Sequence, residues 1–183
     1  FVVNEIRSLT SDGLDAGEIA VFYRTHAQSR PLEEVLLRSG LRYRIVGNVR
    51  FYERKEVRDA LAYLRVVSNP EDDVALQRIL NVPKRGLGDR TVEQVAAFAA
   101  REQISFEAAL RRAPETGIGP RAETRIGGFL ALLDELRVLL DSGADPEEMV
   151  EAVLDQSGLV AELQASNDPQ DESRLENLAE LAS

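Results

Sequence analysis

Apolar and polar positions follow two different patterns along this chain, one near its start and another through the rest. Residues 19–23 (IAVFY) and 43–47 (YRIVG) are short apolar runs bounded by turn-forming residues, which is typical of buried parallel strands. Between them, Pro31 begins a run of apolar positions at helical spacing that Gly40 ends. A strand, a helix and a second strand within roughly 30 residues predict a parallel α/β unit.

From residue 54 onward the apolar positions have the spacing of helices. Residues 54–68 place Val57 and Leu64 on one helix face, and Pro70 follows the end of this helix. Similar patterns occupy residues 1–10, 74–81, 91–101, 105–112, 121–142, 146–157 and 172–183. The predicted fold class is therefore α/β but mostly helical: a partial parallel α/β domain followed by a helical subdomain.

A domain boundary is predicted at residues 113–120 (APETGIGP), where glycine, proline and threonine are concentrated. Residues 1–116 would form the α/β part, and residues 117–183 would form the helical subdomain. The chain starts without methionine, and both of its ends fall inside helical patterns. We therefore expect it to be a fragment of a larger protein.

Charge is distributed unevenly along the chain. The net charge is −10, yet residues 1–90 hold 15 Lys and Arg against 13 Asp and Glu, whereas residues 91–183 hold 7 against 19. The global charge thus hides a basic first half. The absence of cysteine excludes disulfides and thiolate metal sites. No apolar run reaches the ~18 residues of a membrane span, and no signal peptide is evident, so we expect a cytoplasmic protein with no membrane partner.

Tyr23 and Arg24 stand at the carboxyl end of the first predicted strand, where ligands bind in open parallel sheets. A tyrosine ring can stack on a base for ~1–3 kcal/mol, and an arginine can form a charge-assisted fork with a phosphate. The pair would therefore suit a nucleotide. An exposed arginine beside a half-buried tyrosine is the other interpretation that spacing alone leaves open.

Two basic stretches have the composition of nucleic-acid contacts. Residues 41–58 interleave cations with aromatic rings, as single strands require, because cations follow phosphates and rings stack on bases. Residues 81–91 (NVPKRGLGDRT) combine cations with glycines that allow close backbone approach and with a helix start that offers N–H groups to an anion. The candidates are Arg50, Phe51, Arg54, Lys55, Lys84, Arg85, Gly86 and Gly88. A basic helix face with its aromatic rings in the core, and an ordinary interhelical loop, are the alternatives.

Ser157 and Gly158 form a helix–turn–helix junction that could present backbone amides to phosphates, although its acidic surroundings favour a plain structural turn. No Walker A spacing occurs in the chain. No carboxylate pair, metal cluster or Ser/His/Asp arrangement stands out as a catalytic site.

Together these stretches resemble the second RecA-like domain of the UvrD/PcrA/Rep superfamily-one DNA helicases. Residues 19–47 and 50–91 carry the resemblance through motifs that have the family's order and spacing. DQSGL and ESRLENLAEL are similar, more loosely, to the helical subdomain inserted in that domain. The departures are His26, where many members have Asn, and Asn48, where many have Gly.

The resemblance implies roles for these residues. Tyr23 would stack on the adenine of ATP, and Arg24 would contact its γ-phosphate and stabilise the developing charge. Gln28 and Arg30 would make structural hydrogen bonds. The stretch around residue 50 would combine fold-supporting contacts with part of the single-strand path, and the Arg-Gly-x-Gly motif at 85–88 would lie near DNA. The inserted subdomain would touch the duplex or regulate unwinding, with Ser157 and Gly158 as its local candidates. The cofactors would be ATP and Mg²⁺, with the Mg²⁺ ligands elsewhere in the parent protein.

The parent implied by the resemblance is an ATP-dependent 3′–5′ DNA helicase of DNA repair or replication. Its partners would be single-stranded DNA, single-strand/duplex junctions, the rest of the helicase chain with the first RecA-like domain, and DNA-repair proteins. Without a Walker A lysine or an Asp-Glu motif, this fragment alone is expected to be inactive. Two alternatives stay open: a non-catalytic DNA-binding or protein-docking module, and the motor part of a helicase–nuclease subunit.

Overall fold

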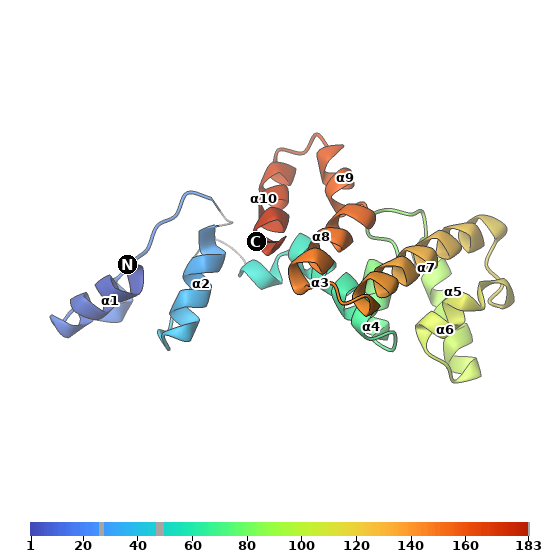
Figure 1. Ribbon diagram of the computed structural model, residues 1–183, viewed down its shortest axis with the longest axis horizontal. Coiled ribbons are helices and arrows are strands. Elements are labelled where there is room, and N and C mark those ends of the chain that lie inside the picture. The colour runs from blue at the N-terminus through green and yellow to red at the C-terminus, as the bar shows by residue number, and fades with distance from the viewer. Residues whose placement is uncertain (26–27, 47–49, 183) are drawn as a thin grey trace. The chain divides into compact units, whose positions relative to one another are not determined.

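The computed structural model describes residues 1–25, 28–46 and 50–182, and every regular element within them is a helix (Figure 1). The prediction of a mostly helical chain is therefore confirmed. The chain forms two compact units, Phe1–Arg54 and Lys55–Ser183. Each unit is considered below by itself.

The first unit has two α-helices in its described residues and a small core of unusual composition. Its elements are α1 (Val2–Ser11), the 3-10 helix η1 (Ala16–Glu18), α2 (Ser29–Arg38) and the 3-10 helix η3 (Phe51–Glu53). Phe51 is fully buried, and the guanidinium groups of Arg30 and Arg54 lie 5.6 and 5.4 Å from its ring centroid. The side chain of Glu33 is buried as well and accepts a hydrogen bond from the backbone N–H of Phe51 at 3.2 Å. This core therefore depends on cations and hydrogen bonds as much as on apolar packing.

Neither of the two predicted strands forms in the described residues. Side chains expected to be buried are exposed instead: 93% for Phe22, 40% for Val21 and 79% for Val46. A strand needs a neighbour to pair its backbone groups, and no partner strand exists among the residues described. The apolar run alone therefore does not produce a strand.

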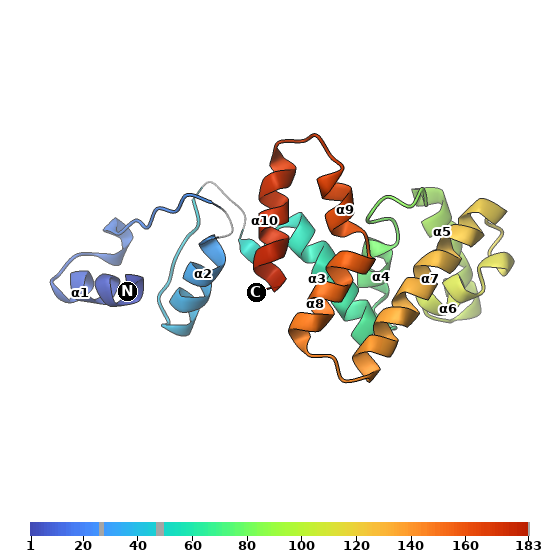
Figure 2. The ribbon, with the colours of Figure 1, turned by 45° about the horizontal axis from the view of Figure 1, so that its top comes forward.

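The second unit, over residues 55–182, is a bundle of eight α-helices around one apolar core (Figure 2). They are α3 (Lys55–Ser68), α4 (Asp73–Ile79), α5 (Asp89–Glu102), α6 (Phe106–Arg111), α7 (Pro120–Asp141), α8 (Pro146–Gln156), α9 (Leu159–Gln164) and α10 (Gln170–Ala182). Helix α3 is central, since it packs against α4, α7, α8 and α10. Tyr63, Leu76, Phe129 and Leu133 are among the fully buried side chains.

Several of these helices begin where their polar residues allow capping. Either Asp72 or Asp73 could cap α4 by its position, and the structure selects Asp72, whose carboxylate accepts the N–H of Ala75 at 3.0 Å. At the start of α8, Asp145 and Glu148 form a reciprocal capping box with two bonds of 2.9 Å. These local contacts set the helix boundaries independently of the core.

The predicted boundary after residue 116 falls inside the second unit. Ala113 and Ile118 are buried in its core, and the 3-10 helix η4 (Ala113–Glu115) together with Gly119 connects α6 to α7. The glycine- and proline-rich stretch therefore joins two helices of one core. The compact units divide the chain at residue 54 instead, and the assignment of 1–116 and 117–183 to family domains stays a prediction.

An ionic network centred on the buried carboxylate of Glu107 fixes α6 against α7 and α3. The Glu107 carboxylate accepts two hydrogen bonds from Arg137, at 2.7 and 2.6 Å, and further bonds from Arg111. Arg111 also binds Asp134 through both of its terminal nitrogens. Arg137 additionally donates to the backbone carbonyl of Val66 on α3 at 3.1 Å. The two carboxylates, Glu107 and Asp134, thus balance the charges of the two guanidinium groups.

Candidate functional site

Tyr23 and Arg24 lie on the segment that leads into α2. The tyrosine is half-buried and the arginine is exposed. Among the described residues, no side chain or carbonyl forms a hydrogen bond or ion pair with the Arg24 guanidinium. Both side chains are therefore accessible to a ligand. The two positions that depart from the family pattern, His26 and Asn48, lie outside the described residues.

Gln28 fixes the backbone of this segment. Its side-chain oxygen Oε1 accepts the N–H of Arg24 at 2.9 Å and that of Thr25 at 3.2 Å. Its own N–H donates to the carbonyl of Thr25 at 3.2 Å. Arg30, two residues on, donates from Nε to Glu34 at 3.0 Å. Both residues thus make hydrogen bonds of the structural kind that the resemblance implies.

The basic stretch around residue 50 contains both buried and accessible candidates. Phe51 is fully buried, and the buried Arg54 donates to the Ser29 hydroxyl at 3.0 Å. In this structure neither the ring nor that guanidinium can reach a nucleic acid, which agrees with the alternative of an aromatic residue in the core. Arg50 and Lys55, by contrast, have side chains that are 63% and 76% exposed.

The loop after α4 is held in shape from within. The Asn81 side-chain oxygen accepts the N–H of Arg85 at 2.7 Å and that of Leu87 at 3.2 Å, and Leu87 is buried. The backbone N–H of Lys84 donates to Glu162 on α9 at 3.0 Å. The loop is therefore a fixed feature of the second unit, with the Lys84 side chain exposed on it.

The Arg85 guanidinium points into the protein. It donates to the carbonyls of Ile79 at 3.2 Å and Pro83 at 3.3 Å, and to the Tyr63 hydroxyl at 2.6 Å. It also lies 4.9 Å from the centroid of the Phe129 ring. These contacts use the guanidinium group that the sequence pattern assigned to DNA binding. In this structure Arg85 therefore stabilises the fold.

Two stretches that are far apart in sequence meet at this loop. Arg85 donates to the carbonyl of Ser157, 72 residues away, at 3.2 Å. Gly158 has a φ of +83°, and a Cβ at this position would lie 3.7 Å from the ring of Pro83. The two predicted phosphate-contact segments, 84–88 and 157–158, therefore lie side by side in the second unit, with Ser157 itself buried. No local pattern in the sequence indicated this contact.

Arg125 on α7 is a cation of this surface that no sequence motif predicted. Its Nη1 donates to the carbonyl of Gly86 at 2.8 Å. Gly86 has a φ of +66°, which favours glycine, and a Cβ there would displace Nη1 of Arg125 from this position. Local spacing carries no information on this pairing, because 39 residues separate the two. Exposed cations near the loop thus include Lys84, Arg90 and Arg125.

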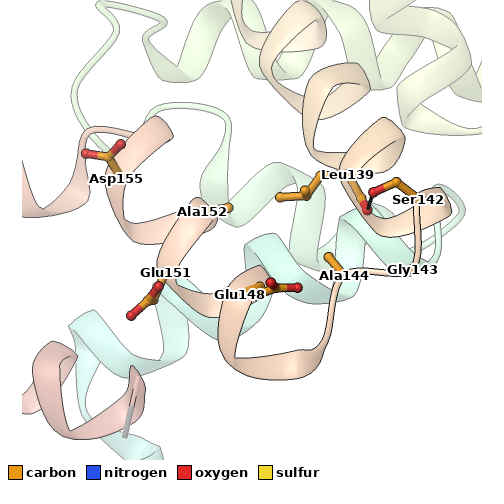
Figure 3. A pocket seen from close by; sticks show the side chains of 8 residues that line it. All are labelled: Leu139, Ser142, Gly143, Ala144, Glu148, Glu151, Ala152 and Asp155. Atoms are coloured by element: carbon orange, nitrogen blue, oxygen red, sulfur yellow. Dashed lines mark hydrogen bonds between the residues drawn. The ribbon is translucent and has the colours of Figure 1, made fainter.

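The described surface of the second unit has depressions that differ in the charge of their lining residues. One depression, of about 560 Å³, is lined by Glu148, Glu151 and Asp155 around an apolar floor, and none of its lining residues is basic (Figure 3). Such a surface repels phosphates. Another, of about 280 Å³, has walls of mixed charge and brings together two predicted residues, Lys55 and Lys84.

The described residues contain no group of three or more His, Asp or Glu that could hold a metal ion. In the same part of the chain, no helix combines the length and apolar character needed to cross a bilayer.

Replacing Arg85 by methionine should lower the free energy of unfolding of the chain by about 2–3 kcal/mol, because buried carbonyls and the Tyr63 hydroxyl lose a charged donor. Urea unfolding followed by circular dichroism measures the change. The matched variant Lys84→Met, at an exposed neighbour, should change stability by less than about 0.5 kcal/mol. An unchanged stability for Arg85→Met would contradict the structural position assigned to Arg85.

Comparison of the sequence with known proteins shows the family of this chain. Residues 1–114 match the model of the UvrD-like helicase C-terminal domain. The ATP-dependent DNA helicase UvrD1 of Mycobacterium tuberculosis (strain ATCC 25618 / H37Rv) is 50% identical over 187 residues, which cover 100% of this chain and 24% of that protein. The ATP-dependent DNA helicase PcrA of Bacillus subtilis (strain 168) is 41% identical over 184 residues, covering 100% of this chain and 25% of that protein.

The chain thus spans about a quarter of the length of these relatives. The family model covers more than half of the chain, in the region that holds Tyr23, Arg24 and the loop at 81–88. This chain belongs to the family of UvrD-like helicase C-terminal domains.

Proposed function

We propose that this chain forms part of an ATP-dependent DNA helicase and supplies one side of its ATP site. The observation that carries the proposal is the Tyr23–Arg24 pair, which presents a half-buried ring beside an exposed guanidinium that no described residue engages. The ring would stack on adenine, and the guanidinium would bind the γ-phosphate and stabilise its charge during transfer. Relatives that are named ATP-dependent DNA helicases support this assignment.

The rest of the ATP site would come from elsewhere in the full-length protein. Mg²⁺ bound with ATP would neutralise part of the phosphate charge. This chain would contribute contacts to the base and the γ-phosphate, and the family resemblance implies that the Mg²⁺ ligands lie elsewhere in the parent protein. The first RecA-like domain would supply the phosphate-binding loop. The fragment alone would therefore not hydrolyse ATP.

The second unit would contribute a DNA contact at the loop 81–88 and the first turn of α5. Lys84 and Arg90 are exposed there, Arg125 lies against Gly86, and the junction at Ser157 and Gly158 adjoins the loop. Most other charges in residues 91–183 are acidic. A phosphate backbone would therefore be attracted to this surface and repelled by the acidic depression. The accessible Arg50 and Lys55 are further candidates for the DNA path.

We place the full-length protein in the cytoplasm, as a 3′–5′ translocase of DNA repair or replication. Its substrates would be single-stranded DNA and single-strand/duplex junctions, and its partners would include DNA-repair proteins. The family resemblance of the Tyr-Arg and Arg-Gly-x-Gly motifs supports this assignment.

The double variant Lys84→Gln/Arg90→Gln should weaken DNA binding by this chain and lower its salt dependence. Fluorescence anisotropy with a labelled single strand and with a 3′-tailed duplex, over a salt series, measures both. The slope of log K against log salt concentration should fall by about 2, because each substitution leaves one phosphate without its cation.

The matched control for this experiment is Arg38→Gln/Arg65→Gln, which removes two exposed arginines from α2 and α3. It should leave the slope within about 0.5 of wild type, since neither arginine lies in the loop. Equal effects of both double variants would show a general charge effect and remove the loop from the DNA site. Binding without any salt dependence would contradict a phosphate-contact surface altogether.

A further inference from the structure

One oxygen atom holds the backbone that carries Tyr23 and Arg24. Gln28 Oε1 accepts the N–H of Arg24 at 2.9 Å and the N–H of Thr25 at 3.2 Å. The two bonds converge on this oxygen from successive residues, so they set both the position of the Arg24 backbone and its direction. Among the described residues nothing engages the Arg24 guanidinium itself. The side chain is therefore placed through its backbone.

Gln28 stands immediately before a firmly anchored helix start. Ser29, the first residue of α2, is buried and accepts a hydrogen bond from Arg54 at 3.0 Å. One turn further on, Glu33 accepts the N–H of Phe51 at 3.2 Å. These contacts tie the first two turns of α2 to η3 and the residue that follows it. Through Gln28, the anchored helix start determines where the Arg24 backbone lies.

We propose that Gln28 is a positioning residue for Arg24, holding the arginine where it can reach the γ-phosphate of ATP. This proposal rests on the proposed role of Arg24. Gln28 is exposed, so its side chain contributes little to the packing of the first unit. Its contribution is the acceptor oxygen rather than buried surface.

Loss of this oxygen should affect turnover more than binding. The N–H groups of Arg24 and Thr25 would turn to water, and the guanidinium would sample a wider range of positions. An interaction made chiefly in the transition state is sensitive to such misplacement, because small displacements of a catalytic group can cost large factors in rate. A fall in kcat with little change in KM is the signature of this effect.

The test uses ATP hydrolysis by the full-length protein that contains this chain. Gln28→Leu should lower kcat about tenfold and change KM for ATP by less than about threefold. Gln28→Glu keeps acceptor oxygens at the same reach and should retain at least about a third of wild-type kcat. Gln77→Leu, at an exposed glutamine on α4, is the matched control and should leave both constants unchanged.

A double-mutant cycle separates positioning from general damage. In an Arg24→Ala background, Gln28→Leu should have no further effect on kcat, because the group it positions is gone. A further fall of about tenfold in that background would overturn the proposal, as would a Gln28→Glu variant as slow as Gln28→Leu. If Arg24→Ala itself leaves kcat unchanged, the proposed function fails and this inference fails with it. If Arg24→Ala is inactive while Gln28→Leu matches wild type, only the inference fails.

Discussion

Replacement of Arg24 by alanine in the full-length protein should lower kcat for DNA-stimulated ATP hydrolysis by about 10³-fold. An arginine that stabilises the charge developing on a transferred phosphoryl group contributes rate factors on the order of 10³–10⁵. Arg24 is exposed, and no described side chain competes for its guanidinium. Steady-state hydrolysis with saturating single-stranded DNA measures kcat, and equilibrium binding of a fluorescent ATP analogue measures the ground-state affinity.

The control for this experiment is Arg38→Ala, at the end of α2 in the same unit. The Arg38 side chain is 78% exposed and forms a surface ion pair with Glu34, so hydrolysis should stay within about twofold of wild type. A hydrolysis rate for Arg24→Ala within about tenfold of wild type would remove Arg24 from the ATP site. A non-catalytic role for the parent would then become the better interpretation.

Replacement of Glu107 by alanine should lower the free energy of unfolding of the chain by about 3–5 kcal/mol. The Glu107 side chain is only 6% exposed and balances Arg137, whose side chain is 18% exposed. Removing the carboxylate leaves the largely buried Arg137 charge with the longer, 3.5 Å ion pair to the half-exposed Asp134, which costs more than the broken hydrogen bonds alone. Urea unfolding of the 183-residue chain measures the change.

Asp134→Ala is the matched control, because it removes the more exposed carboxylate of the same network. The Asp134 side chain is 48% exposed, so the expected destabilisation is at most about 1 kcal/mol. Equal destabilisation by the two variants would show that burial of Glu107 does not determine its contribution.

The contribution of Glu107 to stability should also depend on pH in the acidic range. Burial raises the pKa of Glu107, but hydrogen bonds from Arg137 and Arg111 outweigh it and hold the pKa below its ordinary value of 4.5. A carboxylate whose folded pKa is depressed contributes stability above its unfolded pKa, and this is lost as pH falls through the folded value. The stability of the wild-type chain should therefore decline below about pH 4.5, and Glu107→Gln should decline less steeply over the same range.

Much of the helical structure follows from the sequence by itself. The carboxylates of Asp72 and Asp145 stand at the polar starts of two predicted helical segments, and both cap helices in the structure. These signals are local, since a cap and the N–H group it binds are three residues apart. The family, too, could be predicted from contiguous motifs, and the family model matches the same region of the chain.

Only the tertiary structure decided which candidate side chains face a ligand. Phe51 and Arg85 belong to stretches with the composition of a DNA contact, yet the ring is buried and the guanidinium binds internal carbonyls. Composition reports which chemistry a loop carries, whereas the direction of each side chain depends on partners far along the chain. For Arg85 those partners include Ser157, 72 residues away.

The absence of the predicted strands from the described residues and the unpredicted position of Arg125 also depend on contacts between distant residues. Residues 19–23 have the apolar character of a strand, but a strand exists only when a second backbone pairs with it, and the described residues provide none. Arg125 joins the loop only because the packing of α7 brings it to Gly86. Local spacing therefore determined the helices and the motifs, while contacts between distant residues decided which surfaces these motifs present, because burial and pairing are properties of the folded chain.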